Sequence, residues 1–94
     1  MAIEGQAKIT FELAPIFQQF AGGCRTIEMK ADTVRAGLTR LAKLYPELGK
    51  WLYRADGEPA VLIMLHNEVV LPDRWNRALV DGDEISISPL VYGG

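Results

Sequence analysis

The chain has 94 residues, with 10 Lys+Arg against 12 Asp+Glu and a formal net charge of −2. This length accommodates one domain, which we assign to residues 1–94, and is too short for two. The scattered basic residues argue against nucleic acid as a partner, and the longest apolar run, Ala60 to Leu65, is far shorter than the roughly 20 residues that span a membrane.

The first third of the chain reads as a β-hairpin. Apolar residues stand at every second position in "AKITFEL" and again in "CRTIEMKA": Ile9, Phe11 and Leu13, then Ile27 and Met29. This alternation is typical of strands with one buried face. Pro15 ends the first strand, and we expect a loop that closes with the Gly22-Gly23 turn, since glycine adopts the positive φ that tight turns need.

The period changes in "ADTVRAGLTRLAKLYPEL", which predicts a helix. Its apolar residues recur at spacings of four, three and four and form one face: Val34, Leu38, Leu41 and Tyr45. We expect Asp32 to cap the first turn and Pro46 to end the regular helix. The two leucines should face a sheet, and Gly37 would let the helix approach that sheet closely.

The second half of the chain alternates strands with turns. The segment "GKWLYRADGEPA" reads as an irregular connection that contains an Asp56-Gly57 turn. The run from Ala60 to Leu65 predicts a central strand that is covered on both faces. A short strand at Val69 to Leu71 follows, and "EISISPL" predicts the last strand.

The predicted order is strand, strand, helix, strand, short strand, strand. A single helix must pack its apolar stripe on one face of the sheet, because neither element can bury that surface alone. The sequence therefore predicts an α+β fold of the β-grasp (ubiquitin-like) type, a mixed sheet of about four to five strands with one main helix packed on one face.

Four features stand out in this order along the chain. They are the Gly22-Gly23 turn before the second strand, the helical segment "DTVRAGLTRLAKLYPEL", the turn "LVDGDEISISP" and the final Gly93-Gly94. Together they resemble the MoaD/ThiS family of ubiquitin-like sulfur carriers, and the match runs along most of the chain. The resemblance implies a sulfur carrier and favours the MoaD-like small subunit of molybdopterin synthase.

The resemblance also implies that Gly94 carries the chemistry. A carboxylate is ionised at neutral pH and is a poor electrophile, so a ubiquitin-activating-type enzyme would adenylate it with ATP. Sulfur from a persulfide would then replace AMP and leave a thiocarboxylate. The chain would be a carrier rather than an enzyme, with no permanent cofactor and no metal. Its second partner would be a sulfur-accepting enzyme such as the molybdopterin synthase large subunit.

Residues 90–94 are expected to form a flexible tail that enters the active site of a partner. Gly93 and Gly94 lack Cβ atoms and therefore fit a narrow channel. Pro89 stiffens the exit from the last strand, because its ring fixes φ. Apolar contacts along the channel would come from Leu90, Val91 and Tyr92.

Other functions stay open at this point. Sulfur delivery for cysteine or thiamin synthesis belongs to the same class, because the choice of pathway lies with the partner. A ubiquitin-like modifier would instead be joined through Gly94 to a lysine of a target protein. A β-grasp interaction module would have a tail without chemistry.

Two residues with reactive side chains have simpler structural explanations. His66 ends an apolar strand without a sequence-linked nucleophile, so we interpret it as a structural or surface histidine rather than a general base. Cys24, the single cysteine, is interpreted as a small packing residue, although Arg25 beside it is compatible with a reactive thiol. One cysteine, and no signal pattern in "MAIEGQAKITFE", lead us to expect a cytoplasmic protein.

The acidic turn and three aromatic residues leave two further questions. Asp81, Asp83 and Glu84 are interpreted as a turn signature, because three clustered acids without further ligands make a poor cation site. Aromatic residues in irregular segments mark a partner surface if they are exposed and a core if they are buried. The sequence leaves both alternatives open for Trp51, Tyr53 and Trp75.

Overall fold

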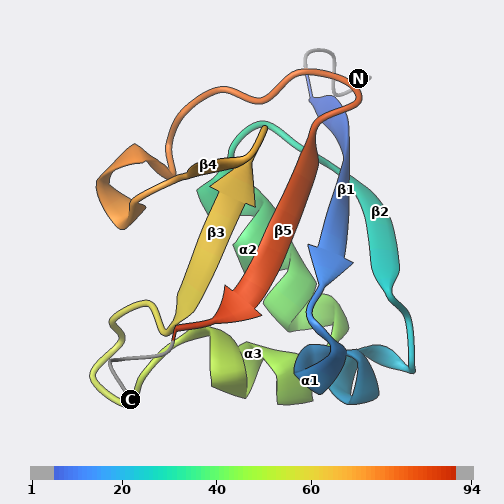
Figure 1. The fold of residues 1–94 in the computed structure, drawn as a ribbon, viewed down its shortest axis with the longest axis vertical. Helices are drawn as coiled ribbons and strands as arrows, with labels where there is room; N and C mark the ends of the chain where they lie inside the picture. The colour runs from blue at the N-terminus through green and yellow to red at the C-terminus, as the bar shows by residue number, and fades with distance from the viewer. Residues whose placement is uncertain (1–5, 91–94) are drawn as a thin grey trace.

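In residues 6–90, the part of the chain that this computed structural model describes, five strands form one mixed sheet with three α-helices packed against it. The elements in chain order are β1 (Ala7–Leu13), α1 (Pro15–Gln18), the 3₁₀ turn η1 (Gln19–Ala21), β2 (Thr26–Ala31), α2 (Val34–Leu44), α3 (Pro46–Leu52), β3 (Val61–Leu65), β4 (Glu68–Val69), the 3₁₀ turn η2 (Pro72–Arg74) and β5 (Glu84–Pro89). Figure 1 shows α2 behind the sheet, and α1 and α3 at the end where β1 and β5 finish. This architecture confirms the predicted β-grasp class.

The strand order is β2-β1-β5-β3-β4, which puts the last strand of the chain in the middle of the sheet. β1 pairs antiparallel with β2, as the predicted hairpin requires, and parallel with β5. β3 runs antiparallel to both β5 and β4. The prediction that the run 60–65 is covered on both faces is wrong, because Leu62 and Met64 are only half-buried on the face away from the helices.

Helix α2 has the predicted end but a different N-cap. The cap is Thr33, whose hydroxyl accepts a hydrogen bond from the backbone N–H of Ala36 at 3.1 Å, so the prediction of Asp32 is wrong. Both residue types cap well, and the extended backbone at Thr33, with φ −142° and ψ 164°, decides between them. At the other end Tyr45 leaves helical geometry just before Pro46, with φ −132° and ψ 83°.

Two short helices that begin at prolines are not predicted by the sequence. α1 starts at Pro15, and α3 starts at Pro46 and occupies part of the segment expected to be irregular. Proline ends the preceding element, but its fixed φ also suits the first position of a new helix, where no N–H is needed. Among the helices of residues 6–90 the longest, α2, has 11 residues, and none is long and apolar enough to cross a membrane.

Gly37 allows α2 to lie directly against β1, as the sequence predicts. A Cβ atom at this position would lie 2.8 Å from Cζ of Phe11 and 3.4 Å from Cδ1 of Ile9. Non-bonded carbon atoms prefer a separation of about 3.5–4.0 Å, so the Phe11 ring occupies the place where a side chain would stand.

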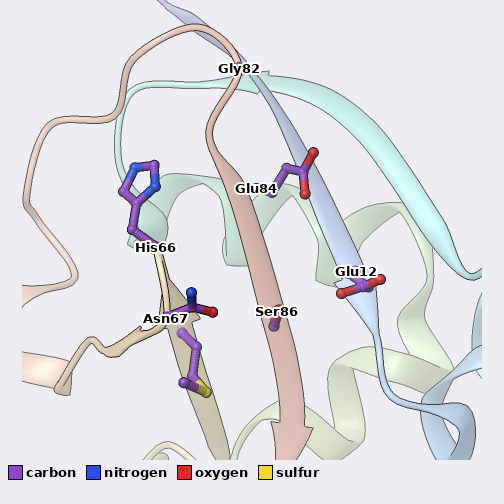
Figure 2. Close-up of a pocket in the computed structure, with 7 residues that line it drawn as sticks. Glu12, His66, Asn67, Gly82, Glu84 and Ser86 are labelled. Atoms are coloured by element: carbon purple, nitrogen blue, oxygen red, sulfur yellow. The ribbon is translucent and has the colours of Figure 1, made fainter.

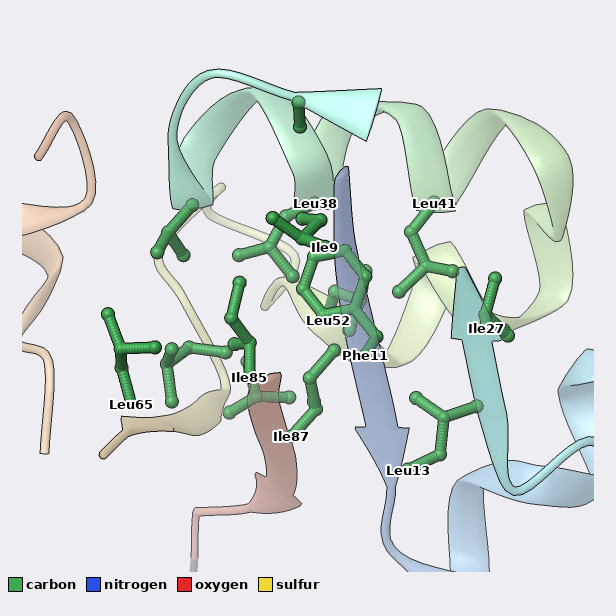
Figure 3. Close-up of a cluster of buried hydrophobic side chains, with 14 of the residues drawn as sticks. Ile9, Phe11, Leu13, Ile27, Leu38, Leu41, Leu52, Leu65, Ile85 and Ile87 are labelled. Atoms are coloured by element: carbon green, nitrogen blue, oxygen red, sulfur yellow. The ribbon is translucent and has the colours of Figure 1, made fainter. Parts of the chain in front are cut away.

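One contiguous core lies between the helices and the sheet (Figure 3). Its buried side chains include Ile9, Phe11, Leu13, Ile27, Leu52, Leu65, Ile85 and Ile87. Leu38 and Leu41 are fully buried, which confirms the predicted phase of α2. Trp75 also belongs to the core, and its indole N–H donates to the carbonyl of Val70 at 2.9 Å.

Candidate functional site

The face of the sheet that the helices leave open carries a groove along β5. The side chains that line this groove on the three strands are Glu12 of β1, Glu84, Ser86 and Ser88 of β5, and Met64 of β3. Two hollows of about 320 and 500 Å³ share Glu12, Met64 and Ser86, so we describe them as one continuous groove. This open-face groove follows β5 from Gly82 to Ser88.

Small side chains form the floor of the open-face groove, and longer ones form its walls. Ser86 is paired with Glu12 on one side and with Met64 on the other (Figure 2). Glu12 and Glu84 make the walls negative, and Arg25 approaches the Glu12 carboxylate to 4.0 Å at one end. A shallow groove of mixed polarity on a rigid sheet is suited to contact with another protein.

A contact between His66 and Asp83 closes one end of the groove. The Nε2 atom of His66 lies 3.0 Å from Oδ1 of Asp83, a residue that is 4% exposed. The second carboxylate oxygen accepts a hydrogen bond from the N–H of Val80 at 2.9 Å. Figure 2 shows the imidazole turned toward Gly82 and away from Ser86, so these side chains do not form a nucleophile and base pair. The contact ties the turn after β3 to the turn before β5, in agreement with a structural histidine.

His66 and Asn67 form the two-residue turn between β3 and β4. Their φ angles are 55° and 64°, and positive φ at both residues is what a type I′ hairpin turn requires. Histidine and asparagine are among the non-glycine residues that adopt this region most often. The second strand of the hairpin therefore begins at Glu68, and β4 is Glu68–Val69 rather than the predicted Val69–Leu71.

The acidic turn before β5 mainly serves the fold, as the sequence indicates. Oδ1 of Asp81 accepts a hydrogen bond from the N–H of Lys8 at 2.8 Å, and Asp83 makes the two contacts described above. Gly82 turns the chain between them with φ 90°, while Glu84 stands in the groove. Within residues 6–90, no three His, Cys, Asp or Glu side chains are grouped so that they could hold a metal ion.

The last strand, β5, ends next to one end of the open-face groove. Pro89 is the final residue of β5 and is paired with Val61 of β3. Leu90 is 37% exposed, and its N–H donates to the carbonyl of Ala60 at 3.3 Å. The ladder thus reaches the first residue assigned to the tail. The other predicted site residues lie outside the described range: Val91, Tyr92, Gly93 and Gly94.

The sequence does not predict the open-face groove. Its members belong to three strands that are far apart along the chain, and only the pairing of β1, β5 and β3 brings them together. The one signal in the sequence is the alternation of β5, in which the small residues Ser86 and Ser88 follow the buried residues Ile85 and Ile87. Taken singly, such residues read as an ordinary solvent-facing side of a strand.

Cys24 and the aromatic residues have clear positions in the structure. Cys24 is exposed, so its interpretation as a packing residue is wrong. Trp75 is 1% exposed and Tyr53 packs partly against the core, whereas Trp51 is 50% exposed. The Trp51 ring stacks on Phe20, with ring centroids 5.4 Å apart.

Solved structures of similar proteins share this fold over nearly the whole chain. SAMP1 from Haloferax volcanii is 26% identical, with a TM-score of 0.77, and the match covers 94% of this chain and 100% of that one. CysO from Mycobacterium tuberculosis is 25% identical, with a TM-score of 0.76 and coverage of 88% and 99%.

A third match is to the complex of subunits 1 and 2 of the molybdopterin-converting factor from Helicobacter pylori. It is 23% identical, with a TM-score of 0.63, and the match covers 93% of this chain and 99% of that one. This likeness shows a shared fold. Among curated proteins, no sequence is significantly similar to this chain.

The ThiS family is matched over residues 16–94. This range begins in α1 and includes β2, α2, the three later strands and the predicted tail. It covers far more than half of the chain and confirms the resemblance that the sequence motifs suggested. The protein belongs to the ThiS family.

Proposed function

We propose that this protein is a sulfur carrier whose C-terminal Gly94 is adenylated and then converted to a thiocarboxylate. The observation that carries the proposal is the family match, which extends over residues 16–94 and therefore includes Gly93 and Gly94. The exit of the tail supports it. Because β5 is the central strand and is paired on both sides, the tail starts from a fixed point at Leu90.

An activating enzyme supplies the first step. A ubiquitin-activating-type enzyme transfers AMP from ATP to the Gly94 carboxylate and releases pyrophosphate, which turns a poor electrophile into a reactive mixed anhydride. The terminal sulfur of a persulfide then displaces AMP. A thiol reduces the resulting acyl disulfide and leaves the thiocarboxylate on the carrier. In this scheme the chain is the substrate of its partners and not a catalyst.

The open-face groove is the surface that this activating enzyme covers. The groove ends at Ser88, and the tail begins two residues later at Leu90. An enzyme that holds Gly94 therefore lies against the same end of the sheet. The acidic walls at Glu12 and Glu84 fit a partner with basic side chains along this contact.

The acceptor decides the pathway. We propose molybdopterin synthesis, with the large subunit of molybdopterin synthase as the acceptor, because the sequence motifs resemble the MoaD-like small subunit. Sulfur delivery for cysteine or thiamin synthesis is the alternative within the same class. These pathways share the activated carrier and differ in the enzyme that takes the sulfur.

A protein modifier is the second candidate function. The specific observation is the 26% identity to small archaeal modifier protein 1 from Haloferax volcanii. A modifier would use the same adenylate but would transfer Gly94 to a lysine amine, which forms an isopeptide bond and releases the activating group.

Intact-mass analysis of the protein purified from its own host tests the two functions. A carrier gives a species heavier by the exchange of one oxygen for sulfur at Gly94, which reacts with an alkylating agent at its terminus. A modifier gives branched conjugates in which Gly94 is joined to lysine. Finding only conjugates would replace the carrier assignment with the modifier.

ATP–pyrophosphate exchange with the activating enzyme tests the role of the tail. Deletion of Gly94, Gly93→Trp and the addition of one residue after Gly94 should each abolish exchange, because they move the carboxylate or widen the tail. The thermal midpoint of each variant should match that of the parent protein, since the core lies in residues 7–87. Full exchange by the Gly94 deletion would overturn the proposed chemistry.

A further inference from the structure

An exposed aromatic pair lies at the end of the molecule where α1 and α3 are found. The rings of Phe20 and Trp51 are stacked, with centroids 5.4 Å apart and an interplanar angle of 26°. Phe20 packs partly against the core, whereas Trp51 is 50% exposed. A tryptophan held in place by a stacked neighbour and half open to solvent is typical of a residue that contacts another protein.

Two backbone hydrogen bonds connect the end of α3, the helix that carries Trp51, to the start of the tail. The N–H of Leu90 donates to the carbonyl of Ala60 at 3.3 Å, and the N–H of Ala60 donates to the carbonyl of Leu52 at 2.9 Å. Because the N and O atoms of one residue are only a few ångströms apart, the backbones of Leu90 and Leu52 lie within about 10 Å of each other. Trp51 precedes Leu52 in α3, so its backbone lies within about 14 Å of Leu90.

The length of the tail limits how far away a partner can be. Four residues follow Leu90, and at about 3.3 Å for each residue they reach roughly 13 Å. An enzyme that encloses Gly94 must therefore approach the protein closely around Leu90. The space it occupies includes the region of Trp51, and Leu90 itself adds an apolar side chain that is 37% exposed.

The charges near Trp51 favour an apolar contact. The two ionic side chains of α3, Glu47 and Lys50, form an exposed ion pair with each other at 3.2 Å. They leave no net charge on this short helix to attract a charged partner surface. Trp51 and Leu90 are apolar side chains that an apolar partner surface would remove from water.

We propose that the Phe20–Trp51 pair is a docking site for an apolar surface of the adenylating enzyme that activates Gly94. The inference rests on the proposed function and adds a second contact to the open-face groove. The enzyme contacts the carrier on two sides of Leu90, where the tail begins. The groove lies on one side, and the aromatic pair of η1 and α3 lies on the other. The tail enters its active site between these two contacts.

Affinity measurements with truncated side chains test the proposal. The adenylating enzyme from the same host, with ATP and Mg²⁺ present, is titrated with the parent protein, Trp51→Ala, Trp51→Phe and Val80→Ala. Trp51→Ala should weaken binding at least about tenfold, and Trp51→Phe should recover most of the loss because it keeps a ring stacked on Phe20. A thermal melt of each variant accompanies the titrations.

Val80→Ala is the matched control. Val80 is 64% exposed and lies in the turn beside the start of β1, where the Gly82 N–H donates to the Lys8 carbonyl. The seven residues of β1 separate this turn from α1 by about 20 Å. Its affinity should equal that of the parent protein. Equal affinities of Trp51→Ala and Val80→Ala would overturn the proposal.

Footprinting of the unmodified protein provides a readout that does not depend on the folding of a variant. Hydroxyl radicals should oxidise Trp51 in the free protein, and the enzyme should protect it while leaving Val80 reactive. Unchanged oxidation of Trp51 in the complex contradicts the docking site. The tail variants separate the two hypotheses: if Gly94 deletion stops exchange but Trp51 stays reactive in the complex, the function stands and the docking site does not.

Discussion

The two faces of the sheet are built by alternate residues of the same strands, yet they serve different purposes. On β1, Phe11 is fully buried beneath α2, while its neighbour Glu12 stands in the open-face groove. On β5, Ile85 and Ile87 belong to the core, while Ser86 between them forms the groove floor. The packed face makes the structure stable, and the open face leaves a surface for a partner.

This comparison makes a physical prediction about substitutions. A change on the packed face removes buried contacts or leaves a cavity, so it lowers the free energy of unfolding. A change on the open face removes little buried surface, so it alters binding with a small effect on stability. The four substitutions below are ordered by their expected effect on the free energy of unfolding.

Phe11→Ala should have the largest effect. The ring fills the space over Gly37 and has no exposed surface, so its loss should lower the free energy of unfolding by about 3–5 kcal/mol. Urea denaturation measures the change. Glu12→Gln on the next residue is the control for the other face and should stay within about 0.5 kcal/mol. Similar losses for both variants would show that the faces are not energetically distinct.

Asp83→Ala should have the next largest effect. The buried Asp83 joins the turn after β3 to the turn before β5. It does so through its contact with His66 and the hydrogen bond that it accepts from the N–H of Val80. Hydrogen bonds to charged groups contribute about 1.5–3 kcal/mol, and the part-buried N–H of Val80 would lose its acceptor. Asp81→Ala, whose carboxylate is exposed, should cost less in the same denaturation experiment. The reverse order would contradict the structural role given to Asp83.

Thr33→Ala should have a moderate effect, because it removes the N-cap of the helix that covers the packed face. The hydrogen bond to the N–H of Ala36 is lost, at a cost of about 1 kcal/mol. Asp32→Ala should change stability by less than about 0.5 kcal/mol, since Asp32 does not cap the helix. Thermal or urea unfolding of the two variants distinguishes the observed cap from the one that the sequence predicts.

The sequence predicts the packed face well, because burial leaves a periodic signal. Alternation identified β1, β2 and β5, and the spacing of Leu38 and Leu41 gave the correct phase of α2. Two of the errors fall where one residue type has two structural uses. Pro15 and Pro46 end one element and also begin the next, and Asp32 and Thr33 are both good cap residues.

The site is less predictable than the core, because its signals are weak or depend on pairing. The tail residues Pro89 and Leu90 can be found from their position before Gly93-Gly94. The groove needs the parallel pairing of β1 with β5, which no local pattern of residues specifies. The exposure of Trp51 also depends on α3, a helix that the sequence does not predict.

Ser86→Arg should have the smallest effect on stability and a large effect on function. Ser86 is half-buried on the groove floor, and the long arginine side chain can extend along the open face, so unfolding should change by less than about 0.5 kcal/mol. The side chain fills the groove and reverses part of its charge, so the rate of adenylation at limiting carrier concentration should fall at least about tenfold. Thr39→Arg adds the same side chain to the exposed surface of α2, away from the groove, and should leave the rate unchanged. If the two variants are activated equally well, the open face is not the surface that the activating enzyme covers, and the tail is recognised without the groove.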